Sequence, residues 1–121
     1  SNAVDDNQLR ELQVEMIDRF GLLPEPVKTL FRVTNLKLRS ELLGIKKIDG
    51  GPNGGKLEFD QDTSIDVGII VDLVQSEPHR YKLATANQLV FNEKMEKPET
   101  RFNKIERLLE RLEKRQTAIA S

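Results

Sequence analysis

The sequence predicts an α+β fold: a single compact domain with the order ααββαββα, in which two short β-hairpins pack on amphipathic helices. Four stretches repeat apolar residues at helical spacing, and two pairs of short runs surround turn-forming clusters. No long linker or repeat interrupts the 121 residues, which are 37% hydrophobic and 32% charged, as in one globular domain. We place the domain at residues 4–121, because residues 1–3, Ser-Asn-Ala, resemble the scar of a cleaved tag on an excised piece of a longer protein.

The first predicted helix covers residues 9–20. Its apolar residues gather on one side, which should face the core: Leu9, Leu12, Met16, Ile17 and Phe20. An Asp or Asn at positions 5–7 can cap the start, and Gly21 stands where the helix should end.

The second predicted helix opens at residues 24–26, Pro-Glu-Pro, and ends at Gly44. Its main apolar face consists of Val27, Leu30, Phe31, Leu38 and Leu42. Val33, Leu36 and Leu43 widen that face, so we expect this helix to be buried on more than one side.

Two hairpins and two further helices follow. Residues 45–48 and 56–59 are predicted strands around a long, flexible loop at 49–55. Asp62, Thr63 or Ser64 should cap a third helix, which ends before Pro78 and carries Ile65, Ile69, Ile70, Leu73 and Val74. Residues 81–84 and 88–91 form the second pair of strands.

The last helix starts at Pro98 and carries Phe102, Ile105, Leu108, Leu109 and Leu112. The six aromatic residues fall on these stripes and strands and should belong to the core.

Composition excludes several classes of function. Nineteen Lys and Arg balance 20 Asp and Glu, a net charge of −1, which argues against a protein that coats nucleic acid. The absence of Cys excludes disulfides, thiolate metal sites and a cysteine nucleophile. His79 is the only histidine and should lie in a surface loop. With no membrane span or signal peptide in the sequence, we expect a cytoplasmic domain without catalytic, cofactor or metal site.

The segment Gly50–Lys56 matches the phosphate-binding pattern G-x-x-x-x-G-K. The next residue is Leu57, where the motif requires a hydroxyl for Mg²⁺, and a strand pattern follows where a helix N-terminus should bind the phosphate. Pro52 also removes one N–H donor. We therefore interpret the segment as a hairpin turn and not as a nucleotide site.

Glu11, Glu15 and Asp18 form an acidic stripe on the first predicted helix. At about 100° per residue they lie within about 60° of each other, opposite the apolar side. Two interpretations remain open: a solvated helix face, or a docking surface for a basic partner.

Residues 101–121 carry six basic side chains and three acids. The basic residues are Arg101, Lys104, Arg107, Arg111, Lys114 and Arg115. Spacings such as that of Glu110 and Lys114 favour an exposed helix with i,i+4 pairs. The alternative is a nucleic-acid or RNA-polymerase contact through its basic face.

Residues 11–24, Glu-Leu-Gln-Val-Glu-Met-Ile-Asp-Arg-Phe-Gly-Leu-Leu-Pro, resemble the signature E-L-x-x-E-[ML]-x-D-R-F-G-x-[LI]-P. This signature opens the C-terminal domain of the bacterial transcription-repair coupling factor family. The resemblance continues through residues 43–48, 57–59 and 81–83 into the last helix, and so covers about residues 9–119.

The resemblance implies a regulatory domain of a large multidomain protein that uses ATP and Mg²⁺ to translocate on DNA, dislodges stalled RNA polymerase and recruits UvrA. The motor motifs belong to other domains, so this piece should not be an enzyme. In the family the domain packs on an N-terminal UvrB-like module and covers the surface that UvrA uses. Glu15 and Asp18, with Glu11 one turn earlier, match its acidic contacts to that module. Direct DNA binding by the domain is not implied.

Overall fold

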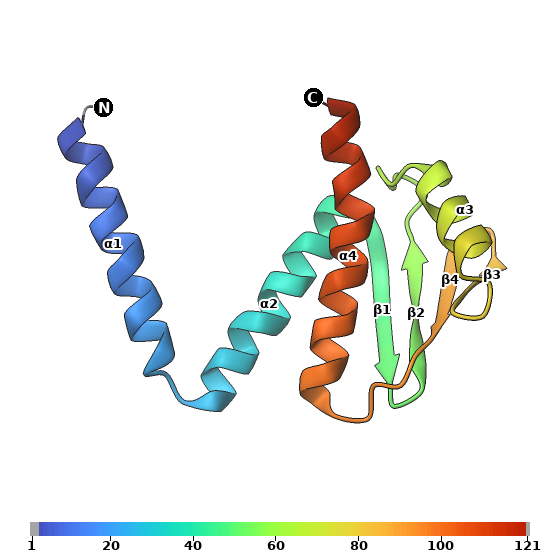
Figure 1. The fold of residues 1–121 in the computed structure, drawn as a ribbon, viewed down its shortest axis with the longest axis horizontal. Helices are drawn as coiled ribbons and strands as arrows, with labels where there is room; N and C mark the ends of the chain where they lie inside the picture. The colour runs from blue at the N-terminus through green and yellow to red at the C-terminus, as the bar shows by residue number, and fades with distance from the viewer. Residues whose placement is uncertain (1–2, 121) are drawn as a thin grey trace. The chain divides into compact units, whose positions relative to one another are not determined.

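The computed structural model describes residues 3–120, with side chains over residues 7–113. The chain divides into an N-terminal unit, which ends at Asn35, and a C-terminal unit, which begins at Leu36. The division falls within the second helix, and each unit is described by itself. The α+β class and the order ααββαββα are confirmed (Figure 1).

The N-terminal unit consists of α1 (Ala3–Gly21) and the first part of α2 (Glu25–Leu43). The backbone N–H groups of Leu22 and Leu23 donate to the last carbonyls of α1, and Pro24 O accepts from Val27 N and Lys28 N. Helix α1 begins at Ala3, so the expectation of a cap at positions 5–7 is wrong. Ala and acidic residues are well tolerated in a first helical turn, which lets the helix extend back through these positions.

The apolar stripe of α1 is exposed in this unit, and the prediction that it forms a core face is wrong. Leu9 is 55% exposed, Met16 61% and Phe20 41%. The ring of Phe20 lies 5.9 Å from that of Phe31 in α2, but Phe31 itself is exposed. Two helices by themselves offer too few partners to bury a whole stripe, whereas a stable core needs two full layers.

The C-terminal unit contains one antiparallel sheet. Its strands are β1 (Ile45–Gly51), β2 (Gly54–Phe59), β3 (Tyr81–Thr85) and β4 (Gln88–Asn92), in the order β1-β2-β4-β3. Both hairpins are confirmed. The pairing of β2 with β4, which joins them into one sheet, was not predicted.

The first hairpin is tighter than the run of glycines predicts. The ladder continues to the pair Gly51–Gly54, which leaves only Pro52 and Asn53 in the turn, so the long flexible loop at 49–55 is wrong. Gly54 has a φ of 143°, and a Cβ there would lie 2.1 Å from the carbonyl oxygen of Phe91 in the neighbouring strand. The glycines therefore let β1, β2 and β4 approach closely.

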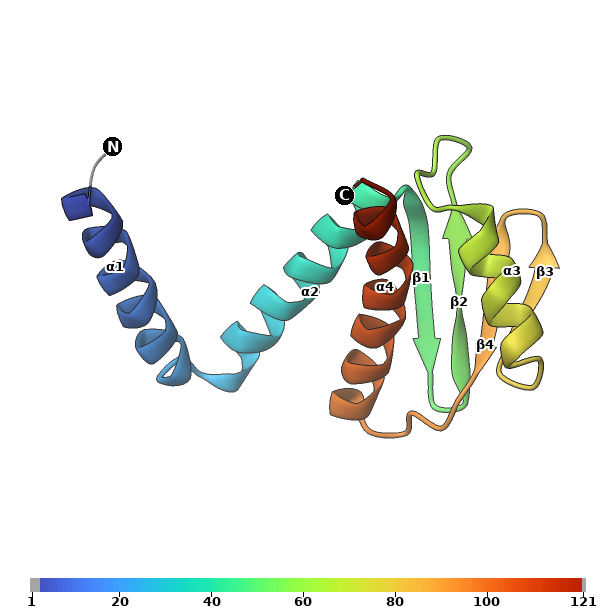
Figure 2. The same cartoon turned by 45° about the horizontal axis from the view of Figure 1, so that its top comes forward.

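Alternation along the strands separates a core face from an outer face. One row across the core face runs from Ile48 to Leu57, Leu89 and Leu83. Figure 2 shows helices α3 (Val67–Ser76) and α4 (Pro98–Ala120) beside this sheet. These helices and the end of α2 contribute further buried residues, as do Ile65 and Met95 in the loops. The largest fully buried side chains are Phe91, Leu57, Leu89, Met95, Leu109 and Leu112. The core therefore lies on one face of the sheet.

Helix α2 turns a different face to this core than its apolar spacing predicts. Ser40 and Leu43 are buried and Leu36 packs against the core, whereas Leu38 and Leu42 are exposed. Ser40 is tolerated there because its hydroxyl donates to the carbonyl of Leu36 at 2.7 Å within the same helix. The predicted main apolar face, and burial on more than one side, are therefore wrong.

Three helix ends were predicted with different success. Helix α2 ends at Gly44, as expected: its φ is 74°, and a Cβ would lie 2.5 Å from Thr63 Cα. Helix α4 starts at Pro98, as expected. Helix α3 is capped by Asp66, whose side chain accepts from Gly68 N at 2.8 Å, so the expectation of a cap at positions 62–64 is wrong.

Candidate functional site

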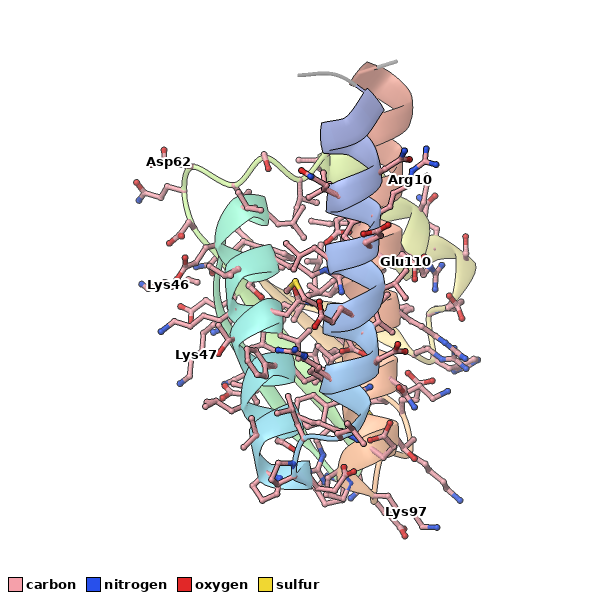
Figure 3. The ribbon with its side chains drawn as sticks, turned by 90° about the vertical axis from the view of Figure 1, so that its left-hand side faces the viewer. Arg10, Lys46, Lys47, Asp62, Lys97 and Glu110 are labelled. Atoms are coloured by element: carbon pink, nitrogen blue, oxygen red, sulfur yellow. The ribbon has the colours of Figure 1, made fainter. Side chains whose placement is uncertain are left out.

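The acidic stripe lies on α1, on the surface of the N-terminal unit. Glu11, Glu15 and Asp18 are exposed, and with Arg10 and Val14 they line one shallow, open surface of the helix. Figure 3 shows Arg10 projecting from α1. Because α1 has no proline or break across these residues, its backbone fixes the spacing of the three carboxylates.

Two arginines partly compensate this charge. Glu15 pairs with Arg19 one turn later, and both side chains are more than half exposed. Residues 1–20 nevertheless hold five acids against two bases, so the segment has a net negative charge. All three carboxylates of the stripe are exposed to water on a convex helix surface, which does not enclose a substrate as acid–base catalysis requires. The arrangement suits contact with a basic surface.

The basic face of α4 is largely occupied within the C-terminal unit. Lys104 Nζ lies 2.9 Å from Glu93 Oε1, and Arg111 Nη1 lies 2.9 Å from Glu77 Oε2. Arg101 Nη2 donates to the carbonyl of Met95 at 3.1 Å. Arg107 is exposed, and the side chains of Lys114 and Arg115 lie outside the described residues, as does the predicted Glu110–Lys114 pair. Over residues 98–113 these contacts argue against α4 as a phosphate-binding face.

Arg80 extends these pairs into a network across the same region. Its Nη1 lies 3.2 Å from Glu77 Oε1 and 3.8 Å from Glu93 Oε1, so Arg111, Glu77, Arg80, Glu93 and Lys104 alternate in charge. Tyr81 lies beside it, with Arg111 Cζ 5.7 Å from the ring centroid. Burial raises the pKa of Tyr81, and the positive charge of Arg111 opposes that rise. The network links α4 to the end of α3 and to the segments that flank β3 and β4.

The G-x-x-x-x-G-K segment is part of the β1–β2 hairpin. Lys56 lies in β2 and is exposed on the outer face of the sheet, and the chain after it continues as a strand. The turn therefore lacks the helix N-terminus that a phosphate-binding loop requires.

A histidine site, a metal site and a membrane-spanning helix are the remaining possibilities over the part of the chain that the structure describes. His79 is exposed beyond the end of α3, as expected. Within the described residues no group of three His, Cys, Asp or Glu side chains could hold a metal ion. In the same residues no helix is long and apolar enough to cross a membrane.

The sequence profile of the TRCF domain family matches residues 1–70, more than half of the chain and all of α1 and α2. The chain belongs to the TRCF domain family. The resemblance drawn from residues 11–24 is thereby confirmed, and the acidic stripe lies inside the matched segment.

Curated relatives of this TRCF domain are named transcription-repair-coupling factors. The protein of Escherichia coli (strain K12) is 34% identical over 113 residues, which are 93% of this chain and 10% of that protein. The protein of Haemophilus influenzae is 43% identical over 75 residues, 62% of this chain and 6% of that protein. That of Buchnera aphidicola subsp. Acyrthosiphon pisum is 33% identical over 91 residues, 75% of this chain and 11% of that protein. The chain thus spans about a tenth of the length of the relatives it matches.

Proposed function

We propose that this TRCF domain is the C-terminal regulatory domain of a transcription-repair coupling factor and acts as an autoinhibitory protein-interaction domain. The observation that carries the proposal is the acidic stripe of α1. Glu11, Glu15 and Asp18 are exposed together on one continuous helix, inside the segment that matches the family. The stripe lies opposite the apolar stripe and is exposed, so basic side chains of a partner can reach its carboxylates.

The partner in this proposal is the N-terminal UvrB-like module of the same protein. Contact with the stripe masks the surface of that module that UvrA uses, and restrains an ATP- and Mg²⁺-dependent DNA translocase in nucleotide-excision repair until RNA polymerase is engaged. The motor belongs to other domains, so this domain is not itself an enzyme and binds no cofactor. We place the protein in the cytoplasm.

The energetics of exposed charges suit such a contact. A solvent-exposed ion pair contributes only about 0.2–1 kcal/mol. Three carboxylates can therefore add stability and orientation to an interface without making it permanent. A contact that must open when polymerase is engaged needs this property.

The test removes charge from the stripe in the full-length coupling factor that contains this chain. Glu15→Ala with Asp18→Ala should raise UvrA binding several-fold, because the masking contact loses two charge pairs. The matched control is Asp62→Ala with Glu96→Ala, which removes the same charge from exposed positions in the C-terminal unit. UvrA affinity is measured by surface plasmon resonance at low and high salt.

Two results would contradict the proposal. One is a UvrA affinity that the stripe variant leaves unchanged although circular dichroism shows the domain to be folded. The other is an equal rise for the control variant, which would show a general effect of net charge and not a contact made by the stripe.

A further inference from the structure

The outer face of the sheet carries four lysines that the sequence analysis did not single out. Lys46 and Lys47 lie on β1, Lys56 on β2 and Lys82 on β3, and all four are exposed. Sequence spacing hides them because they come from three strands up to 36 positions apart. Along β2 the exposed Lys56 precedes the buried Leu57, but Lys46 and Lys47 are adjacent in β1, so no regular alternation marks this group in the sequence.

The strand register places these lysines in two neighbouring rows. One row runs across the sheet as Asp49, Lys56, Val90 and Lys82. The next runs as Lys47, Glu58, Gln88 and Thr85, and Lys46 lies at the bulge in β1 beside it. Lys56 and Lys82 are two strands apart, about 10 Å. We call the residues of both rows, together with Lys46, the lysine face.

The lysine face is turned away from the helices that cover the core. Figure 3 shows Lys46 and Lys47 projecting to one side of the sheet, while Glu110 of α4 projects on the other. The side chain of Lys47 is 61% exposed, and its Nζ lies 3.8 Å from Asp49 Oδ2, a long distance for an ion pair. The amino groups are therefore accessible to a large ligand.

We propose that the lysine face contacts the phosphate backbone of duplex DNA without sequence preference. Duplex DNA carries one negative charge per about 1.7 Å of its axis, so a flat basic face meets several phosphates in any register. Lysine binds phosphate as a point charge and needs no fixed geometry. Gln88, Thr85 and Asn92 add hydrogen-bonding groups on the same face.

The composition of the face distinguishes duplex DNA from other partners. Protein interfaces centre on apolar and aromatic residues, but Val90 is the only large apolar residue in the two rows. Single-stranded nucleic acid is bound by stacking on aromatic side chains, and the two rows contain none. What remains is a charged, hydrogen-bonding surface, which fits a phosphate backbone.

The acids of the face set the strength of this contact. Asp49 and Glu58 reduce the net charge of the lysine face from +4 to +2. The contact should therefore be weak, with a dissociation constant in the non-specific range of about 10⁻⁴–10⁻⁶ M. With two to four phosphates neutralised, the logarithm of the association constant should fall with the logarithm of salt concentration at a slope of about −2 to −4.

This inference goes beyond the proposed function, since it concerns a different surface and a different partner. Weak backbone contact is compatible with the near-neutral composition, which argues only against a protein that coats nucleic acid. A failure of DNA binding would leave the UvrA experiment unaffected, and the reverse also holds.

The experiment titrates the 121-residue chain against a short fluorescent DNA duplex and measures anisotropy over a salt series. Lys56→Gln with Lys82→Gln should weaken binding about ten-fold and make the salt slope shallower by about two. The matched control is Lys94→Gln with Lys97→Gln, which changes the net charge equally at exposed positions between β4 and α4. This control should keep nearly the full affinity.

A second variant tests the opposite direction. Glu58→Gln removes a negative charge from the centre of the face and should tighten binding several-fold, whereas Glu96→Gln in the loop should not. Absence of salt-dependent duplex binding, equal losses in both lysine pairs, or binding of polyglutamate in preference to the duplex would each overturn the proposal.

Discussion

At the scale of single residues, the glycines of the first hairpin serve packing. Gly54 and Gly55 lie where β2 passes between β1 and β4, and a Cβ on either would come within 2.1 Å of a carbonyl oxygen in a neighbouring strand. The resemblance of this segment to a phosphate-binding loop therefore arises from a steric requirement of the sheet.

Gly54→Ala should destabilise the chain by about 2–4 kcal/mol. The left-handed φ of 143° is strained for any residue with a Cβ, and the Phe91 carbonyl blocks the position of that Cβ. Gly51→Ala is the matched control across the same turn, because a Cβ there would lie 3.7 Å from Gly54 O, an ordinary contact. Urea unfolding measures both, and equal losses would show that alanine is unfavourable throughout the hairpin for another reason.

At the scale of elements, charge pairs link α4 to α2, to the end of α3 and to the segment after β4, in addition to the apolar contacts. Glu93 follows β4, has a side chain only 14% exposed, and lies within 4 Å of both Lys104 and Arg80. Arg39 near the end of α2 makes a further pair with Glu113 of α4, at 2.9 Å. Over residues 98–113, where the side chains of α4 are described, Lys104 and Arg111 thus serve the fold, although Arg107 is exposed.

Glu93→Gln should lower the free energy of unfolding by about 1–2 kcal/mol. The substitution removes the carboxylate that pairs with Lys104 in a partly desolvated site, and it removes the longer of the two pairs of Arg80, whose pair with Glu77 remains. Glu96→Gln, at an exposed position in the same loop, should change stability by less than about 0.5 kcal/mol. Thermal melts at low and high salt compare the two, and a loss no larger than that of the control would mean that the pairs of Glu93 add nothing to stability.

At the scale of the whole molecule, local patterns predicted the elements, and long-range contacts decided which faces are buried. The sequence predicted four helices and two hairpins correctly because periodicity and helix-ending glycines act locally. The apolar stripes of α1 and α2 were predicted to be buried, but they are largely exposed in the structure. In α2, for example, Leu42 is 81% exposed, while Ser40 is buried. Periodicity marks an apolar stripe but cannot say whether a second layer covers it.

The surface residues show the same difference between local patterns, which can be predicted, and long-range contacts, which cannot. Glu11, Glu15 and Asp18 belong to one helix, so their grouping could be predicted from spacing, and the structure places them together and exposed. Their role as partner contacts stays a prediction. The lysine face could not be predicted in the same way, because it depends on the pairing of β2 with β4, which no local pattern encodes.

The exposed apolar stripe of α1 leads to a prediction about dynamics. Helices α1 and α4 both carry apolar residues at helical spacing, but in α4 the residues Ile105, Leu108 and Leu109 are buried, whereas in α1 those from Leu9 to Phe20 are exposed. Most helical stability in proteins comes from the packing of such a face. Amide protons of α1 should therefore exchange with solvent about a hundred-fold faster than those of α4 between residues 105 and 112.

Hydrogen exchange read by mass spectrometry on the 121-residue chain separates two situations. Fast exchange in α1 beside slow exchange in α4 means that the stripe is open to water in solution. Equal protection means that it is covered there, since intrinsic propensity alone leaves isolated helices of this length marginal. The substitution Met16→Gln gives a second test. It should leave the free energy of unfolding unchanged if the stripe is open to water, and lower it by about 1–3 kcal/mol if the stripe is covered. The same measurement on the full-length coupling factor should show α1 protected, because a helix that presents its acidic stripe to a partner must itself be held in place.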